Sequence, residues 1–338
     1  MNNPKTAIMV ILGRGCNMHC KYCIQRDIKK NQCDDINDKN IDKVIDFLDK
    51  NGSEGDLLSF YGGEPLLYFD DIVKICQSPK THKYEKIMAT NGKLLTSEKV
   101  FQLNELGIEV IVSWDGDAST HARGFDVLTK KKDVLLQVKK LKFHGVLSSK
   151  VSIYEAFKKI GEFNHEYYSV HHKDVWLDFS PATPYNGSFG VEAYSPERYR
   201  QDIRKFLKDK TALGNFFIEN MKYRLYKRLN GEIPSNNLNY NCHVGNCIGL
   251  KLNGEITACG NKDIVIANTE TPYADIKKQA IKENDCRRRE EKCMKCMYYG
   301  ITCKTTPCSM ISDEDQELYC QNGHQYGKVL FEEINSLL

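Results

Sequence analysis

The sequence predicts an α/β fold with a parallel sheet built of βα units. Two observations predict this class. Short apolar runs alternate with segments of helical spacing through the first half of the chain, which is typical of parallel sheets. Polar loops that carry glycine follow several of the predicted strands, as ligand-binding loops do in such folds. The 338 residues suffice for one large domain or two of ordinary size.

Six strands are predicted, each a short run dominated by apolar residues. The first, residues 7–12, is continuously apolar, as expected of a strand buried on both faces. The others cover residues 56–60, 84–89, 108–113, 151–154 and 175–179. Apolar residues at helical spacing predict helices between and after these strands. The helices cover residues 40–50, 70–77, 97–106 and 126–143, with one or two more over 195–229.

Composition excludes several classes of function. The formal net charge of +3 is too close to neutral to favour nucleic acid or an anionic membrane as a partner. No stretch approaches the roughly 20 apolar residues of a membrane span. The chain runs from Met1 into a strand-like segment, so we expect no signal peptide and a cytoplasmic protein.

The 14 cysteines are unevenly distributed. Three lie within residues 16–23, Cys33 and Cys76 stand alone, and nine lie between residues 242 and 320. In a reducing compartment, clustered cysteines favour metal binding over disulfides. The sequence therefore predicts metal chemistry near the start of the chain and in a cysteine-rich tail.

The first three cysteines, Cys16, Cys20 and Cys23, form a C-x3-C-x2-C pattern directly after the first predicted strand. Three thiolates on one loop suit three irons of a [4Fe–4S] cluster and leave the fourth iron open to a ligand. Two other interpretations fit the spacing alone. One is a zinc site with His19 as the fourth ligand, and the other is the buried face of a helix.

Four polar loops are expected to share one edge of the sheet. They are the cysteine loop, Gly62-Gly63-Glu64, Thr90-Asn91-Gly92 and the Ser113/Asp115 pair, and each follows a predicted strand. The carboxyl ends of parallel strands meet at one edge, where ligands bind. A tight turn explains any one of these loops, but their convergence indicates an active site.

With the cysteine loop and Gly62-Gly63-Glu64-Pro65 both present, residues 6–180 resemble the radical S-adenosylmethionine (SAM) enzymes. The resemblance implies a partial (βα)6 barrel of the TIM type. It also implies a cluster whose open iron binds the amino and carboxylate groups of SAM, which is then cleaved reductively to a 5′-deoxyadenosyl radical.

The resemblance further implies which residues contact SAM. Glycines let the backbone approach the cofactor, Glu64 accepts a hydrogen bond from the SAM ammonium, and Arg123 binds the carboxylate. His121 and Arg123 are only two residues apart, which departs from the H-x-x-R spacing of the family, and Asn91 also suits a plain turn. The full expected set is Gly62, Gly63, Glu64, Asn91, Ser113, Asp115 and Arg123.

The tail resembles the SPASM domain, which carries two auxiliary [4Fe–4S] clusters. Family precedent assigns Cys242, Cys247, Cys259 and Cys308 to one cluster, and Cys293, Cys296, Cys303 and Cys320 to the other. A pair of zinc sites is the alternative. Cys76 is expected in the core, Cys286 is a possible substitute ligand, and Cys33 is either a structural thiol or a hydrogen donor.

The expected organisation has three parts. Residues 1–185 form the radical SAM partial barrel, residues 186–240 a helical region and linker, and residues 241–338 the SPASM-like domain. The expected cofactors are SAM and three [4Fe–4S] clusters, of which one binds SAM and two are auxiliary.

The resemblance implies radical chemistry on a peptide, the usual substrate of the SPASM branch. We expect a ribosomally made peptide to be cross-linked, through a thioether or carbon–carbon bond, or epimerised. Oxidation or rearrangement of a sugar or alcohol is an alternative. Sulfatase maturation is disfavoured, because Gly260-Asn261 stands where those enzymes have an aspartate. A non-catalytic zinc- or cluster-binding protein would leave Gly62-Gly63-Glu64 without a purpose.

The expected partners follow from this chemistry. They are a peptide substrate and an electron donor such as flavodoxin or ferredoxin. Because Cys16 lies so close to Met1, we expect a leader peptide to be recognised by a separate protein or by residues 195–229.

Overall fold

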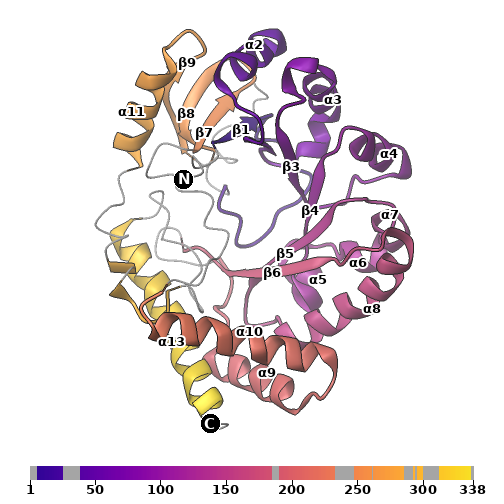
Figure 1. The fold of residues 1–338 in the computed structure, drawn as a ribbon, viewed down its shortest axis with the longest axis vertical. Coiled ribbons are helices and arrows are strands. Elements are labelled where there is room, and N and C mark those ends of the chain that lie inside the picture. The colour runs from indigo at the N-terminus through magenta and orange to yellow at the C-terminus, as the bar shows by residue number, and fades with distance from the viewer. Residues whose placement is uncertain are drawn as a thin grey trace.

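The computed structural model describes residues 6–25, 39–184, 190–232, 247–260, 262–284, 292–293, 295–299 and 312–335. Within these ranges the strands form one nine-stranded sheet, in the order β6-β5-β4-β3-β2-β1-β7-β8-β9. Figure 1 shows the sheet curving around the molecule, with helices on its outer side. The α/β class with a parallel sheet, predicted from the sequence, is confirmed.

Six parallel strands lie side by side in chain order, and each pairs with the next. Their bounds are β1 Ala7–Ile11, β2 Leu57–Tyr61, β3 Glu85–Thr90, β4 Glu109–Ser113, β5 Leu141–Leu147 and β6 Trp176–Pro181. All six therefore end at the same edge of the sheet, which brings the loops that follow them together.

Amphipathic helices cover the outer face of these strands (Figure 1). They are α2 Ile41–Asn51, α3 Phe69–Gln77, α4 Ser97–Glu105 and α8 Ile153–His171. Alternate strand residues such as Val10 and Phe60 are fully buried in one core with helical residues such as Val44 and Leu48. Each such side chain stabilises the fold by roughly 1.5–3 kcal/mol relative to an exposed position. Asn40 caps α2 through a hydrogen bond from Lys43 N, as short polar residues commonly do.

The sequence prediction was wrong between residues 126 and 154. The expected long helix over 126–143 is two short helices, α6 Val127–Lys130 and α7 Lys132–Leu135, and the fifth strand is β5. Side chains of β5 are alternately buried and half-buried, the period of a strand, but its lysine and histidine obscure this pattern. The expected strand at 151–154 is the start of α8, where the side chain of Ser152 accepts a hydrogen bond from Glu155 N, a capping pattern that was overlooked.

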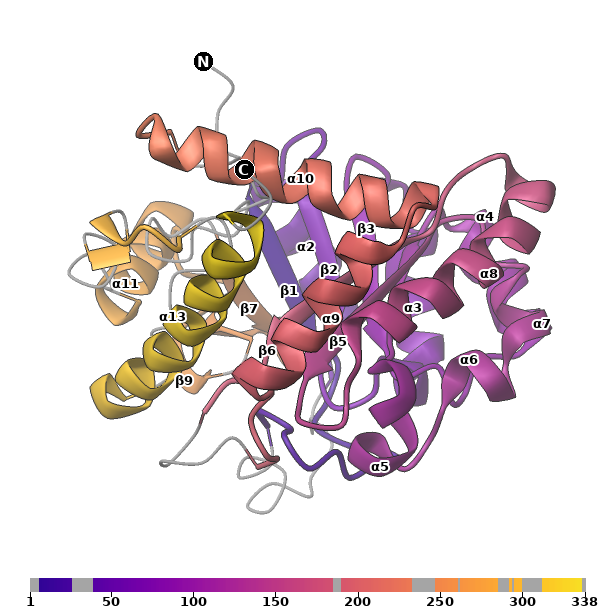
Figure 2. The ribbon, with the colours of Figure 1, turned by 90° about the horizontal axis from the view of Figure 1, so that it is seen from below.

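Shorter helices complete the loops at the carboxyl edge of the sheet. One is the 3-10 helix η1 Pro65–Tyr68, which follows β2; a second 3-10 helix, η2 Pro79–Thr81, lies at the opposite edge, between α3 and the start of β3. A third, η3 Gly116–Ala118, runs into α5 Ser119–Arg123 after β4. Figure 2 shows α5 beside the chain segment that follows β1, at one end of the sheet.

The sheet continues beyond residue 241, where the SPASM-like domain was predicted to begin. Strand β7 Cys247–Lys251 pairs in parallel with β1, so that Ala7 faces Cys247. Strands β8 Glu255–Cys259 and β9 Lys262–Asn268 follow as antiparallel neighbours, and α11 Tyr273–Glu283 packs on them. Strand β7, the first described element of the tail, is thus hydrogen-bonded to β1. The division into three domains stays a prediction.

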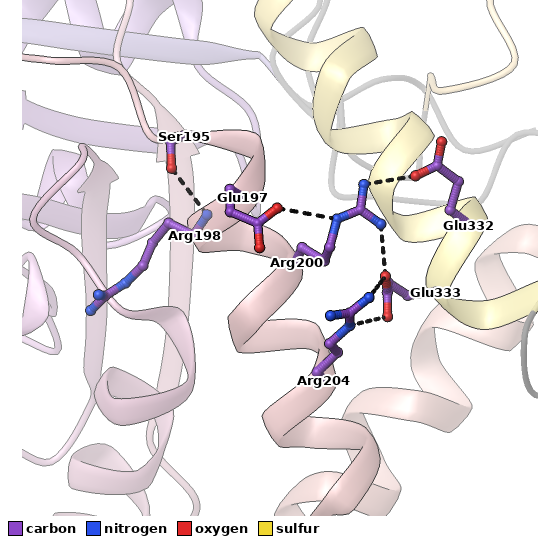
Figure 3. Close-up of polar contacts among 7 residues, drawn as sticks. All are labelled: Ser195, Glu197, Arg198, Arg200, Arg204, Glu332 and Glu333. Atoms are coloured by element: carbon purple, nitrogen blue, oxygen red, sulfur yellow. Dashed lines mark hydrogen bonds and ion pairs between the residues drawn. The ribbon is translucent and has the colours of Figure 1, made fainter.

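Two helices over residues 195–229 are present as predicted, α9 Pro196–Lys208 and α10 Ala212–Leu229. The last helix of the structure, α13 Asp313–Asn335, packs against α9. Figure 3 shows the ionic clasp between them, in which Arg200 and Arg204 of α9 reach Glu332 and Glu333 of α13 at 2.7–3.0 Å. The clasp helps to position α13, which carries Cys320. Among the described residues no helix is long and apolar enough to cross a membrane.

Candidate cluster and cofactor site

The cysteine loop after β1 is bonded through its backbone to the loop after β2. Gly63 N donates to Gly13 O at 3.0 Å, and Glu64 N donates to Gly15 O at 2.8 Å. A Cβ on Gly63 would lie 2.0 Å from Gly15 O, which no side chain tolerates. Gly62 has a φ of +150° and its Cβ would lie 2.3 Å from Gly13 O. Both glycines are therefore required for the contact between two loops, whether or not a ligand also approaches them.

Tyr68 of η1 supports the same loop from the other direction. Gly15 N donates to Tyr68 Oη at 3.0 Å. A Cβ on Gly13 would lie 2.3 Å from the Tyr68 ring, so only glycine leaves room for the ring at this point. Tyr68 thus fixes the position of Gly13 and Gly15, which lie just before Cys16.

Glu64 connects the loop after β2 to the loop after β3. Its side chain is 1% exposed. Oε1 accepts from Thr90 Oγ1 at 2.6 Å and from Leu66 N at 3.1 Å, and Oε2 accepts from Asn91 N at 2.8 Å. These bonds make Glu64 a structural link in the structure, and its contact with SAM stays a prediction.

Asn91 closes the connection back to the cysteine loop. Its Nδ2 donates to Asn17 Oδ1 at 2.8 Å, and its Oδ1 accepts from Lys93 N at 2.9 Å. The turn role that Asn91 suits from sequence is therefore present, together with a bond to the residue that follows Cys16.

Asp115 is the buried centre of the loop after β4. It is 0% exposed and accepts from Arg123 Nε at 2.9 Å, Arg123 Nη2 at 3.1 Å, Val146 N at 2.9 Å and the hydroxyl of Tyr22. Burial lowers the pKa of Arg123, but Asp115, Tyr22 and Cys20 together raise it by more, so the net pKa lies above its ordinary value. Arg123 is thus held by Asp115, and its contact with the SAM carboxylate stays a prediction.

Tyr22 is a site residue that the sequence reasoning missed. It lies between Cys20 and Cys23, is 8% exposed, and its ring is 5.3 Å from the Arg123 guanidinium carbon. Burial raises the pKa of Tyr22, and Asp115 raises it further. An aromatic residue inside a cysteine motif was the available signal, because such a ring in a polar loop needs a partner for its hydroxyl.

The three thiols of the cysteine loop are half-buried, and none of them forms a disulfide. Burial raises the pKa of Cys20, the Arg123 guanidinium lowers it, and the nearby Cys23 and Cys16 raise it. Cys20 also packs against the small buried cluster of Tyr22, Ala122 and Ala182. Three thiols within electrostatic reach of one another, on a loop fixed by its backbone, fit an iron–sulfur cluster held by this chain.

The sequence-predicted convergence of four loops is present at this edge. Lys21 N donates to Ala122 O at 3.0 Å, which joins the cysteine loop to α5 after β4. Ser113 ends β4, half-buried, in register with His144 of β5. The loops after β1, β2, β3 and β4 therefore form one hydrogen-bonded rim, which we call the cluster rim (residues 13–25, 62–65, 90–93 and 113–125).

Two of the predicted auxiliary ligands face each other in the tail. Gly249 of β7 is opposite Thr257 of β8 and Leu250 is opposite Ile256, and the same register places Cys247 opposite Cys259. Both cysteines are buried, at 2% and 5% exposure. Residues opposite one another in an antiparallel pair have Cβ atoms about 4.5–5.5 Å apart and on the same face of the sheet, which is consistent with the predicted assignment of both cysteines to one cluster.

A second group of predicted ligands lies near α13. Cys296 and Cys320 are close enough for one to raise the pKa of the other, after the larger effect of burial. His324, one helical turn after Cys320, places Nε2 3.3 Å from Cys296 Sγ, and the sequence reasoning missed it. Arg228 Nη2 of α10 donates to Cys296 O at 2.8 Å. Among the described residues, no three His, Cys, Asp or Glu side chains lie close enough together to bind one metal ion.

The remaining cysteines divide into two that are described and five that are not. Cys293, a predicted auxiliary ligand three residues before Cys296, is buried at 6% exposure. Cys76 lies in the core on α3, as predicted, and burial raises its pKa to about 12. The other five lie outside the described residues: Cys33, Cys242, Cys286, Cys303 and Cys308.

Comparisons with known proteins agree with this site. Residues 6–125, which include the cysteine loop, match the family model of a 4Fe-4S single cluster domain. The chain is 27% identical over 201 residues to the radical SAM cyclopropyl synthase TigE of Paramaledivibacter caminithermalis, covering 52% of this chain and 42% of that protein. It is 23% identical to the AdoMet-dependent heme synthase of Methanosarcina barkeri, covering 95% of this chain and 97% of that protein.

Solved structures share the fold over most of the chain. Native anSMEcpe with bound AdoMet and the Cp18Cys peptide has a TM-score of 0.65 at 18% identity and covers 99% of both chains. Streptococcus suis SuiB bound to its precursor peptide SuiA has a TM-score of 0.53 at 17% identity, covering 80% of this chain and 64% of SuiB. The partial barrel expected from the sequence is thereby confirmed. With the cluster rim, these similarities show a chain that carries a 4Fe-4S single cluster domain over residues 6–125 and that is similar to radical SAM enzymes in sequence and in fold.

Proposed function

We propose that the chain is an enzyme that cleaves SAM reductively and uses the resulting radical to modify a ribosomally made peptide. The observation that carries the proposal is the cluster rim. Four loops that follow consecutive parallel strands are joined by hydrogen bonds, and three unpaired thiols lie within one of them. When bound, the [4Fe–4S] cluster and SAM supply a 5′-deoxyadenosyl radical that abstracts hydrogen from the substrate.

The residues of this chain would bind and orient these groups. Cys16, Cys20 and Cys23 would hold the cluster, with backbone bonds from Gly63 and Glu64 keeping their loop in place. The SAM-binding set would be Gly62, Gly63, Glu64, Asn91, Ser113, Asp115 and Arg123.

Arg123 is the residue of this set whose geometry leaves most capacity for SAM. Nε and Nη2 are bound to Asp115, while a guanidinium has five N–H donors. The remaining donors suit a carboxylate, and Asp115 would fix their direction. The buried Tyr22 beside the guanidinium would keep water from this face of the site.

The auxiliary ligands would hold two further clusters. One set would be Cys242, Cys247, Cys259 and Cys308, and the other Cys293, Cys296, Cys303 and Cys320. The facing positions of Cys247 and Cys259 and the proximity of Cys296 to Cys320 support this division. Forming a peptide cross-link removes two electrons and two protons from the substrate. The 5′-deoxyadenosyl radical takes one of each as a hydrogen atom, a proton is released, and such clusters would accept the remaining electron.

Two neighbours support a peptide as the substrate. anSMEcpe is solved with bound peptides, and SuiB is solved with a precursor peptide. The chain has the fold of anSMEcpe over nearly its whole length. A small-molecule substrate is the second candidate, because the similarity to the AdoMet-dependent heme synthase also spans nearly the whole of both chains.

Iron content and SAM cleavage test the enzyme. After anaerobic reconstitution we expect about twelve irons per chain, the sum of three [4Fe–4S] clusters, and formation of 5′-deoxyadenosine with dithionite. Cys20→Ala should lose the SAM-binding cluster and all 5′-deoxyadenosine formation. Cys76→Ala removes a core thiol on α3 and should keep both the SAM-binding cluster and 5′-deoxyadenosine formation. Stoichiometric zinc in place of iron would contradict the proposal.

Mass spectrometry tests the substrate class. Peptides encoded by short reading frames beside the gene are incubated with the enzyme and SAM. Loss of two hydrogen atoms indicates a cross-link, and unchanged mass with deuterium uptake from solvent indicates epimerisation. Turnover of SAM without either change in any such peptide would favour the small-molecule candidate.

A further inference from the structure

A pocket of about 360 Å³ opens beside the cysteine loop. Its lining comes from three segments of the cluster rim. Residues 17–19 and Lys21 belong to the cysteine loop, Lys93 follows β3, and residues 121–125 comprise the end of α5 and the turn after it. The pocket thus lies where the loops after β1, β3 and β4 meet.

The pocket is strongly basic. Half of its lining residues are lysine, arginine or histidine, and none of the described lining residues is acidic. Asp115 balances the charge of Arg123, whereas Lys21 Nζ lies 3.1 Å from His121 Nε2 and forms no ion pair with a carboxylate of the described residues. Lys93 lies over the Phe125 ring, with its Nζ 6.0 Å from the centroid. Two ammonium groups therefore give the pocket a positive field, which attracts anionic groups.

The pocket is lined by residues that lie between the predicted cluster ligands in the sequence. Residues 17–19 separate Cys16 from Cys20, and Lys21 is one of the two residues that separate Cys20 from Cys23. His19, Lys21, Lys93 and His121 are exposed, whereas Cys20 packs beside buried Tyr22 and Ala182. A partner in the pocket would contact the residues between the cluster ligands without entering the buried side of the site.

Electron delivery is the step of the proposed function that needs such an approach. Each reductive cleavage of SAM consumes one electron, which must come from outside the SAM molecule. The rate of electron transfer falls steeply with distance, so a protein donor must bring its own redox centre close to the cysteine loop. A basic contact surface favours a donor with carboxylates around its redox centre, because opposite charges steer association.

We propose that this pocket is the docking site of an acidic one-electron donor protein of the flavin or iron–sulfur class. This rests on the proposed function. One electron passes from the reduced donor to the cluster held by the cysteine loop, the donor is oxidised by one electron, and no atom is transferred. A carboxylate of the donor occupies the pocket near Lys93 and Lys21.

The test compares two reductants on one charge-reversal variant. Lys93→Glu is reconstituted, and 5′-deoxyadenosine formation is measured with reduced flavodoxin and with dithionite, which needs no docking surface. We expect the flavodoxin-driven rate, divided by the dithionite-driven rate, to fall about tenfold or more at low salt. The ratio of the two rates in Lys93→Gln should lie between the ratios of Lys93→Glu and the wild type. Added salt should slow the flavodoxin-driven rate of the wild type more than that of Lys93→Glu.

Lys74→Glu is the matched control, because Lys74 is an exposed lysine of α3 outside the pocket. Its ratio of rates should equal that of the wild type. An unchanged ratio in Lys93→Glu would overturn the docking proposal. So would a raised KM for the peptide under dithionite, because that result would assign the pocket to the substrate.

The two proposals fail in different ways. If the wild type forms no 5′-deoxyadenosine with dithionite, the proposed function is wrong. Docking is measured separately, as the rate at which reduced flavodoxin bleaches the visible absorption of the reconstituted cluster in the absence of SAM. A bleaching rate in Lys93→Glu equal to that of the wild type would overturn docking even if SAM cleavage is confirmed.

Discussion

Arg14 Nη1 donates a hydrogen bond of 2.9 Å to the carbonyl oxygen of Gly260. Arg14 is 5% exposed and lies at the start of the cysteine loop, while Gly260 directly follows Cys259. A Cβ on Gly260 would lie 3.0 Å from Met9 and 3.1 Å from Tyr61, so the acceptor is tightly packed. The predicted SAM-binding cluster and the predicted auxiliary site are thus joined by one buried arginine.

Arg14→Ala should weaken this connection. Hydrogen bonds to charged groups contribute roughly 1.5–3 kcal/mol, so we expect the free energy of unfolding to fall by about 2 kcal/mol in urea titrations. Arg14→Lys should recover only part of the loss, because an ammonium lacks the planar fork of the guanidinium. Lys50→Ala, at an exposed position of α2, should change stability little. Equal stability of Arg14→Ala and the wild type would show that the bond contributes nothing.

Gly63→Ala should disrupt the cysteine loop directly. The added Cβ would lie 2.0 Å from Gly15 O and 2.5 Å from Arg14 O, and backbone atoms cannot yield as a flexible side chain does. We expect a loss of about 1–3 kcal/mol in stability, typical of overpacking, and less iron at the first cluster. Gly161→Ala is the control, because nothing lies within 4 Å of its added Cβ in α8. It should stabilise the chain by up to about 1 kcal/mol.

The sequence predicted the cluster rim because its signals are local. The C-x3-C-x2-C pattern, Gly62-Gly63-Glu64 and Asn91 each follow a short apolar run, and parallel strands bring such loops to one edge. The hydrogen-bond partners of these residues were not predictable in the same way. Glu64 accepts hydrogen bonds from Thr90 and Asn91, and these contacts form only because a neighbouring strand brings the two loops together.

The sequence reasoning failed where tertiary contacts override a local pattern. Lysines around β5 resembled a solvated helix, although the strand is held between β4 and β6. His324 meets Cys296 only because α13 packs beside that segment. The bond from Arg14 to Gly260 spans 246 positions, and no single-sequence pattern indicates a contact at that separation.

Asp115→Asn tests the buried charge pair of the site. Asp115 is 0% exposed and is the ion-pair partner of Arg123, whose side chain is 8% exposed. The asparagine would leave the Arg123 charge uncompensated, and breaking a buried pair typically costs about 3–5 kcal/mol. We expect a loss of that size in the free energy of unfolding, measured in urea. Asp70→Asn, an exposed position of α3, should have almost no effect, and a similar loss in both variants would contradict the assignment.

Glu333 makes the clasp between α9 and α13 sensitive to pH. Hydrogen bonds from Arg204, and then from Arg200, hold the pKa of Glu333 below its ordinary value of 4.5. A carboxylate whose pKa is lowered by folding adds stability above the unfolded pKa and loses it as the pH falls through the folded pKa. The clasp shown in Figure 3 should therefore be intact at neutral pH and weaken below about pH 4.5.

Glu333→Gln isolates this contribution. At neutral pH its melting temperature should lie below that of the wild type, because the amide carries no charge for Arg200 and Arg204. The difference should shrink as the pH falls below 4.5, since the wild-type carboxylate is then neutralised as well. Glu98→Gln, at an exposed position of α4, should change the melting temperature little at neutral pH. If the Glu333→Gln difference does not vary with pH, the carboxylate does not titrate with the clasp, and α13 is held to α9 by its apolar contacts alone.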